Sequence, residues 1–164
     1  MAQPREIRQL LSILDQAYDH RSWHGTNLRG SIRGLSPRQA AWRPAADRHN
    51  VWEVVVHAAY WKYAAWRRLA RAPRGAFPLK GSNWFRRPSP DAGASEKAWR
   101  NDLALLQEMH DSLRTAAAAL EPGHLYQKHR GSADSDFSLV AGAAAHDLYH
   151  AGQIQLLKRL RERQ

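Results

Sequence analysis

The segment Asn50–Arg68, NVWEVVVHAAYWKYAAWRR, contains the clearest structural signal in the chain. Asn50 is a favourable helix N-cap, and Glu53 follows three residues later, as in a capping box. The residues that share one face of the resulting helix recur every three or four positions, at Val54, His57, Ala58, Trp61, Ala65 and Leu69. We therefore predict an amphipathic helix from Asn50 to about Arg71, before Pro73.

Three more long helices are predicted from the same periodicity. They span about Arg5–His20, Ser95–Leu120 and Ser138–Arg161, and a short helix is expected at Pro37–Trp42. The apolar positions of Ser95–Leu120 follow the alternating four- and three-residue spacing of a bundle seam. No segment shows the alternation of a β-strand. The sequence thus predicts an all-α protein, a four-helix bundle.

The connections between these helices are long. A polar, glycine-containing stretch, Ser22–Gly34, follows the first helix, and residues 72–94 contain four prolines and three glycines. Because long connections can cross a bundle, both a crossover and a simple up-and-down arrangement remain open. The three aromatic residues of 72–94, Phe77, Trp84 and Phe85, lead us to expect that this connection packs across the bundle.

Length and composition limit the classes of protein. The chain has 164 residues and a mass of 18.7 kDa, which predicts a single domain over residues 1–164. No apolar run approaches the length of a membrane span, and the N-terminus lacks an apolar signal region, so we expect a cytoplasmic protein. The absence of cysteine excludes disulfides, zinc fingers, iron–sulfur clusters and a thiolate nucleophile from this chain.

The net charge of +10, from 25 Lys and Arg against 15 Asp and Glu, raises the question of nucleic acid. The positive charges are dispersed, and two of the densest groups fall in the last turns of predicted helices, where the helix dipole favours cations. We therefore do not expect a nucleic-acid partner. A nucleic-acid-binding module remains an alternative, which a steep loss of affinity with salt would identify.

The histidines are the most informative residues. His146 and His150 are spaced i, i+4 on a predicted helix, which puts their side chains about 5–6 Å apart on one face. His57 lies on the inward face of the helix that starts at Asn50. If the two helices pack together, the three imidazoles can bind one divalent ion. Glu53 and Gln153 are then candidates for outer-shell groups that orient these ligands.

The alternative is that these are ordinary core or surface histidines. Two histidines at i, i+4 are a weak signal, and an inward histidine such as His57 can be a satisfied core residue. The residues alone leave both interpretations open. His110 lies on the bundle seam and is predicted to be a core residue. The remaining histidines are predicted to be on the surface: His20, His24, His49, His124 and His129.

Two stretches of the chain resemble the DinB/YfiT-like family of metalloenzymes. One is Asn50–Arg68, with its Trp52-Glu53…His57 pattern, and the other is Ala143–Arg159, AAAHDLYHAGQIQLLKR, with the family's HDxYHxGQI pattern. The resemblance implies a four-helix bundle with long crossover connections. It also implies a three-histidine metal site with His57, His146 and His150 as ligands, and a homodimer.

The resemblance also implies a range of activities. Some members of the family transfer a low-molecular-weight thiol to an electrophile, and others are related to maleylpyruvate isomerase. For this chain we expect a transferase or a hydrolase that acts on a small molecule with a divalent ion, either Zn, Ni or Fe. Because the chain has no cysteine, any thiol comes from outside. No catalytic acid or base is assigned.

The tryptophans bear on the oligomeric state of the protein. The tryptophans Trp23, Trp66 and Trp84 suggest surplus apolar surface, in agreement with a homodimer. A non-catalytic stress-response protein, in which the metal only stabilises the bundle, is the remaining alternative.

Overall fold

The computed structural model describes residues 3–75, 77–128 and 133–163, and it confirms the four long helices. They are α1 (Arg5–Tyr18), α4 (Val51–Leu69), α5 (Glu96–Ala118) and α6 (Asp136–Arg161). The short helix α3 (Pro37–Ala41) is also present as predicted. The prediction missed a second short helix, α2 (Leu28–Ile32), and a 3₁₀ turn at Pro122–His124, both in stretches expected to be loops.

Side-chain caps define where the long helices begin. The side chains of Asn50, Ser95 and Ser135 each accept a hydrogen bond from the third backbone N–H of the helix that follows. Asn27 does the same for α2, which explains how five residues with a central glycine form a helix there. The capping signal at Asn27 is readable in the sequence, but the apolar periodicity of five residues is too short to detect.

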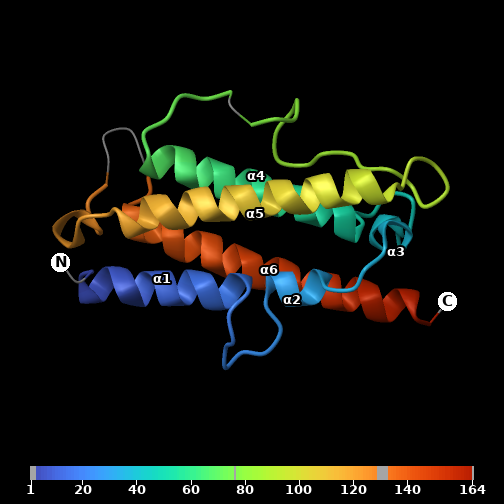
Figure 1. The fold of residues 1–164 in the computed structure, drawn as a ribbon, viewed down its shortest axis with the longest axis horizontal. Helices are drawn as coiled ribbons and strands as arrows, with labels where there is room; N and C mark the ends of the chain where they lie inside the picture. Colours follow the sequence, from blue (N-terminus) through green and yellow to red (C-terminus); the bar gives the residue numbers. More distant parts are fainter. Residues whose placement is uncertain (1–2, 76, 129–132, 164) are drawn as a thin grey trace.

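The long helices form a bundle with one long crossover. Helix α4 packs against α5 and α6, and α1 packs against the other sides of the same two helices. Figure 1 shows that α4 and α5 run in the same direction, so the connection between them travels back along the length of α4. Helices α1 and α6 run in the opposite direction (Figure 1), and α2 continues the line of α1 along α6. The crossover arrangement is therefore the one adopted.

The crossover connection packs on the bundle, as its aromatic residues predicted. Phe85 is buried in the main core cluster, and Phe77 and Trp84 pack against the same cluster. The connection thereby covers the outer side of α4, including the part that contains His57.

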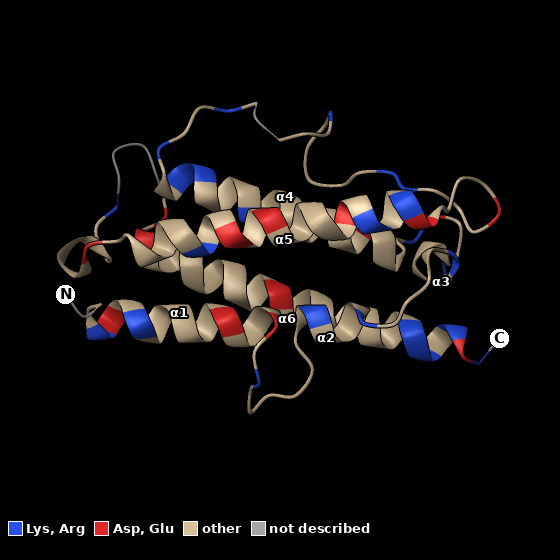
Figure 2. Ribbon diagram, in the orientation of Figure 1, with Lys and Arg blue, Asp and Glu red and all other residues tan. Residues whose placement is uncertain are grey.

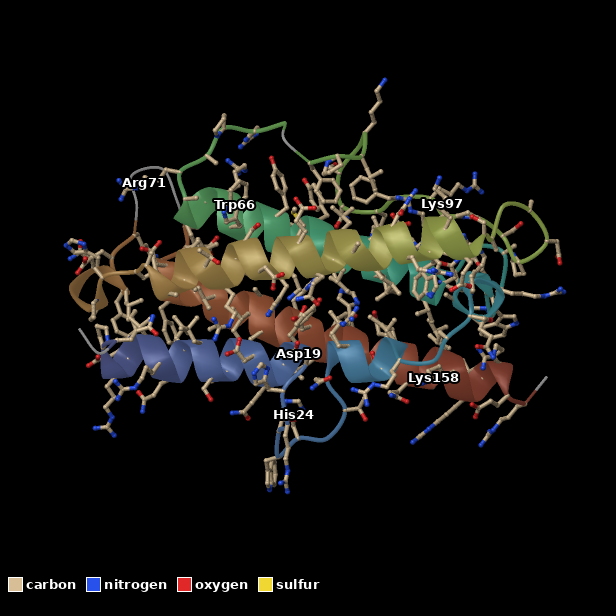
Figure 3. All side chains as sticks on the ribbon, viewed as in Figure 1. Asp19, His24, Trp66, Arg71, Lys97 and Lys158 are labelled. Atoms are coloured by element: carbon tan, nitrogen blue, oxygen red, sulfur yellow. The ribbon has the colours of Figure 1, made fainter. Side chains whose placement is uncertain are left out.

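Charge is spread over all the long helices, with Lys and Arg concentrated at the end of α4 and along the crossover connection (Figure 2). Trp66 and Arg71 mark the end of α4, where this connection begins (Figure 3). Among the described residues, no helix has the length and apolar character needed to span a membrane.

Candidate metal centre

The three predicted histidines meet at the interface between α4 and α6. Nε2 of His146 lies 3.2 Å from Nε2 of His57 and 3.0 Å from Nε2 of His150. One ligand atom from each ring lies within 4.8 Å of the other two. Two nitrogens that bind one ion at about 2.0–2.1 Å are about 2.9–3.3 Å apart if they subtend about 90–109° at it. The distances from His146 to His57 and to His150 therefore fit ligands of one shared ion.

Hydrogen bonds at Nδ1 fix the tautomers of His57 and His150. Nδ1 of His57 lies 2.8 Å from the backbone carbonyl oxygen of Asn83, and Nδ1 of His150 lies 2.7 Å from Oε1 of Gln153. Both oxygens only accept, so each Nδ1 carries the proton and donates it. Each Nε2 then has a lone pair, directed at the third ring.

This arrangement is incomplete without a cation. The lone pairs of His57 and His150 both face Nε2 of His146, which has at most one proton to donate when the ring is neutral. One of the two lone pairs is then left facing another nitrogen. A cation at the centre accepts a lone pair from all three rings. The cluster can thus hold a metal ion.

The rings are held in the neutral state that metal binding requires. Burial, together with the neighbouring His150 and His57, lowers the pKa of His146 to about 3. Burial also lowers the pKa of His150 to about 4, against the hydrogen bond to Gln153. The pKa of His57 is lowered by burial, against its bond to Asn83. No proton has to be displaced from these rings at neutral pH.

Two residues of the crossover connection position His57. Trp84 stacks on the ring of His57, with centroids 3.9 Å apart and planes 12° apart. Asn83 accepts from His57 through its backbone and from Nε1 of Trp61 through its side chain, at 3.0 Å. Asn83 has a φ of 64°, a left-handed conformation in which asparagine is enriched.

The two outer-shell candidates have different places. Gln153 contacts His150 directly. Glu53 instead accepts hydrogen bonds from Arg43 and His49. Burial raises the pKa of Glu53, but the bonds from Arg43 and His49 outweigh burial, and the net pKa is lowered. Glu53 is linked to the surroundings of His57 through His49, whose ring stacks on Trp84 at 3.6 Å, and it also accepts from the backbone N–H of Arg87.

The other described histidines are not part of the cluster, although His49 packs on the far side of Trp84 from His57. His110 is buried against the ring of Tyr18, as predicted for a core residue. His20, His49 and His124 are exposed, and His24 points into solvent from the loop between α1 and α2 (Figure 3). His129, also predicted to be on the surface, lies outside the described residues.

Sequence reasoning missed Asn83 and Trp84 as parts of the site. A backbone carbonyl is not visible as a residue type, so only the asparagine in a loop rich in proline and glycine hinted at a left-handed turn. Trp84 was interpreted as surplus apolar surface, and this is wrong because its ring covers His57. Trp66 is half-buried, and only Trp23 of the three tryptophans is fully exposed.

Comparison with known protein families gave one match. The model of the DinB superfamily matches residues 20–154. The matched range includes the three clustered histidines and both direct partners, Asn83 and Gln153. No match was found among curated proteins or among solved structures.

Proposed function

The chain belongs to the DinB superfamily, and from this premise we propose that it is a metal-dependent enzyme acting on a small molecule. His57, His146 and His150 are the proposed ligands of a divalent ion, either Zn, Ni or Fe. The observation that carries the proposal is the convergence of three Nε2 atoms at 3.0 and 3.2 Å, with the tautomers of His57 and His150 set by Asn83 and Gln153.

The three rings supply a donor set for catalysis. Three neutral ligands leave an ion its full charge and an open position, whereas a structural zinc site usually has four protein ligands. An ion held there lowers the pKa of a thiol or water. Trp84 and Trp61 flank His57 and exclude water from its sides. His146 is half-buried and lines a cavity of about 160 Å³ between α4 and α6, through which a substrate can approach.

Transfer of an external thiol is the reaction that best fits the residues around the three histidines. The thiol sulfur forms a bond to an electrophilic carbon, the bond from that carbon to its leaving group breaks, and the thiol proton departs with the leaving group. Hydrolysis would in addition benefit from a carboxylate that moves protons. The cluster found among the described residues holds no carboxylate, and Glu53 is engaged by Arg43. Asp134 lines the cavity next to His146 but is not part of the cluster. Hydrolysis of a small ester is therefore the second candidate.

The deciding experiment is a product screen with protein loaded separately with Zn, Ni and Fe. Low-molecular-weight thiols are combined with activated aryl halides and epoxides, small esters are offered in parallel, and products are identified by mass spectrometry. We expect thioether product with wild type and with the control His24→Ala, and loss of product with His150→Ala. Protein that binds metal and gains thermal stability, but yields neither thioether nor acid, would assign the ion a structural role.

We further propose that the protein is a homodimer that associates through α6. A stripe of exposed small and apolar residues runs along this helix: Ala145, Tyr149, Gly152, Leu156 and Leu160. Side chains of this kind allow two helices to approach closely and leave apolar surface to be covered. The stripe is next to the histidines, because the ring of Tyr149 lies 5.1 Å from that of His150.

A further inference from the structure

A second, larger cavity lies beside the candidate metal centre. It occupies about 510 Å³ between the second half of α4 and the first part of the crossover connection. This volume is in the range of pockets that bind small molecules, about 300–1,000 Å³. Aromatic side chains form much of its wall: Tyr60, Trp61, Tyr63 and Phe77. Such a wall fits a flat apolar group.

The same cavity is strongly basic. Four cations line it, Arg67, Arg68, Arg74 and Lys80, and no Asp or Glu does. Within the described parts of the chain, none of the four forms an ion pair. Cations that converge on a hollow whose wall carries no acid create a field that attracts anions. Of the four, Arg68 also lines the smaller cavity, where Asp134 is an acidic neighbour.

The helix dipole explains only part of this cluster. Arg67 and Arg68 are in the last turn of α4, where cations are favoured in any helix. Arg74 and Lys80 come from the crossover connection, where no helix end accounts for them. They line the same cavity as Arg67 and Arg68, and Figure 2 shows basic segments spaced along this connection.

Two residues join this cavity to the histidines. Trp61 and Arg68 line both the large cavity and the smaller one that contains His146. The ring of Trp61 lies 6.2 Å from that of His146. On the opposite wall of the smaller cavity, Gly142 leaves open space, since a Cβ placed there would meet nothing within 4 Å. Asp134 also lines the smaller cavity.

We propose that the large cavity binds a small organic anion with a flat apolar body, and that this is the substrate class of the metal site. The body lies against Tyr60, Trp61 and Phe77, and the carboxylate or phosphate is bound by Arg68 with Arg74 and Lys80. The reactive end extends past Trp61 toward His146. This assignment of a substrate rests on the proposed function, whereas binding of the anion to the cavity does not.

The test uses aryl probes that differ in charge. Binding of 1-naphthoate, 1-naphthyl phosphate, neutral 1-naphthamide and inorganic phosphate to metal-free full-length protein is measured by calorimetry at 100 mM salt. We expect both aryl anions to bind at least about tenfold more tightly than naphthamide or inorganic phosphate, because charge-assisted hydrogen bonds and aromatic stacking act together. The ratio between the two aryl anions distinguishes a carboxylate from a phosphate site.

Variants locate the site. Arg68→Ala and the double variant Arg74→Ala/Lys80→Ala should each weaken naphthoate binding by about tenfold or more. The control Arg159→Ala/Arg163→Ala removes two exposed charges from the end of α6 and should change it by less than about twofold. Equal binding of naphthoate and naphthamide, or equal losses in the control and in Arg68→Ala, would overturn the proposal.

A second readout separates this inference from the proposed function. In protein loaded with paramagnetic Co²⁺, the proton resonances of bound naphthoate should broaden, and Gly142→Leu, which fills the smaller cavity, should weaken the broadening. Failure to bind Co²⁺ with naphthoate binding intact would refute the metal site and leave the anion site standing. Bound Co²⁺ with unbroadened naphthoate would refute the connection between the two.

Discussion

Lys62 and Asp147 form an ion pair in the middle of the bundle, where the two side chains are 2% and 1% exposed. The pair joins α4 to α6, the two helices that carry the candidate ligands, and Asp147 directly follows His146 in the sequence. Lys62 also lies 3.4 Å from Nδ1 of His110 and over the ring of Tyr18. Burial raises the pKa of Asp147, and the charge of Lys62 offsets part of that rise.

Breaking this pair should cost far more than replacing it. Asp147→Leu leaves a buried ammonium without its counter-charge, so the free energy of unfolding should fall by about 3–5 kcal/mol. The double variant Lys62→Met/Asp147→Leu removes both charges with side chains of similar size, and it should recover most of that loss. Urea denaturation measures both.

The exposed pair between Arg38 and Asp91 provides the control. Asp91→Leu should leave the unfolding midpoint unchanged, since exposed ion pairs contribute little. A double variant no more stable than Asp147→Leu alone would show that Lys62 and Asp147 stabilise the bundle through other contacts.

We predict that metal binding requires all three candidate ligands. His57→Ala, His146→Ala and His150→Ala should each reduce bound metal to a small fraction of wild type, because each ring supplies one of only three protein ligands. Elemental analysis after dialysis against metal-free buffer measures this loss. His24→Ala, in an exposed loop, is the matched control. Full occupancy in any of the three variants would remove that residue from the site.

Gln153 offers a more selective test. Its Oε1 accepts from Nδ1 of His150, so Gln153→Leu should weaken metal affinity by about 10–100-fold while all three ligands remain. Gln153→Glu retains an acceptor and should restore most of the affinity. Gln155→Leu, two residues further along the same helix, controls for helix stability. A dissociation constant that is the same in Gln153→Leu and wild type would contradict the role of this hydrogen bond.

The sequence predicted the positions of the helices more accurately than it predicted which face of each helix is buried. Periodicity placed α4, α5 and α6 within a few residues, because long amphipathic segments with capping residues have a strong local signal. On α6, however, the predicted face contained His146 and Gln153, whereas Asp147 and Ala151 are more deeply buried. The histidines lie at the edge of the helix interface, which is where a site can be both packed and accessible.

The sequence pattern could not predict the roles of residues that act through tertiary contacts. Lys62 and Asp147 look like surface residues of amphipathic helices, and only the packing of α4 against α6 pairs them. Asn83 takes part through a carbonyl that every residue has. The burial of three imidazoles on inward helix faces suggested a shared ion but left ordinary core histidines open. The resemblance to the DinB/YfiT-like family selected His57, His146 and His150 as ligands.

The exposed stripe on α6 predicts a dimer. Light scattering should give twice the chain mass of 18.7 kDa. Leu156 belongs to the stripe and is 58% exposed, and Leu156→Arg should produce the monomer because it places a charge in an apolar contact. Ile13→Arg makes the same change at an exposed position on α1 and should leave the dimer intact. A wild-type mass equal to one chain would exclude the proposed association.

His110 should make the protein sensitive to acid. Burial, together with the positive charges of Lys62 and Arg114, lowers its pKa from the ordinary value of 6.5 to about 2. The unfolded chain therefore binds a proton at a higher pH than the folded protein. The stability due to neutral His110 is complete above about pH 6.5 and is lost as the pH falls toward 2, by up to about 1.4 kcal/mol per pH unit.

The effect of His110 can be separated from that of the clustered histidines by comparison with a variant. His110→Phe keeps a flat ring against Tyr18 and removes the titrating group. Between pH 7 and pH 5 the free energy of unfolding of metal-free wild type should fall by about 2 kcal/mol more than that of the variant. His24→Phe should follow wild type, because that ring is in solvent in both states. Parallel curves for wild type and His110→Phe would mean that His110 is protonated in the folded protein, and that its site tolerates the charge beside Lys62.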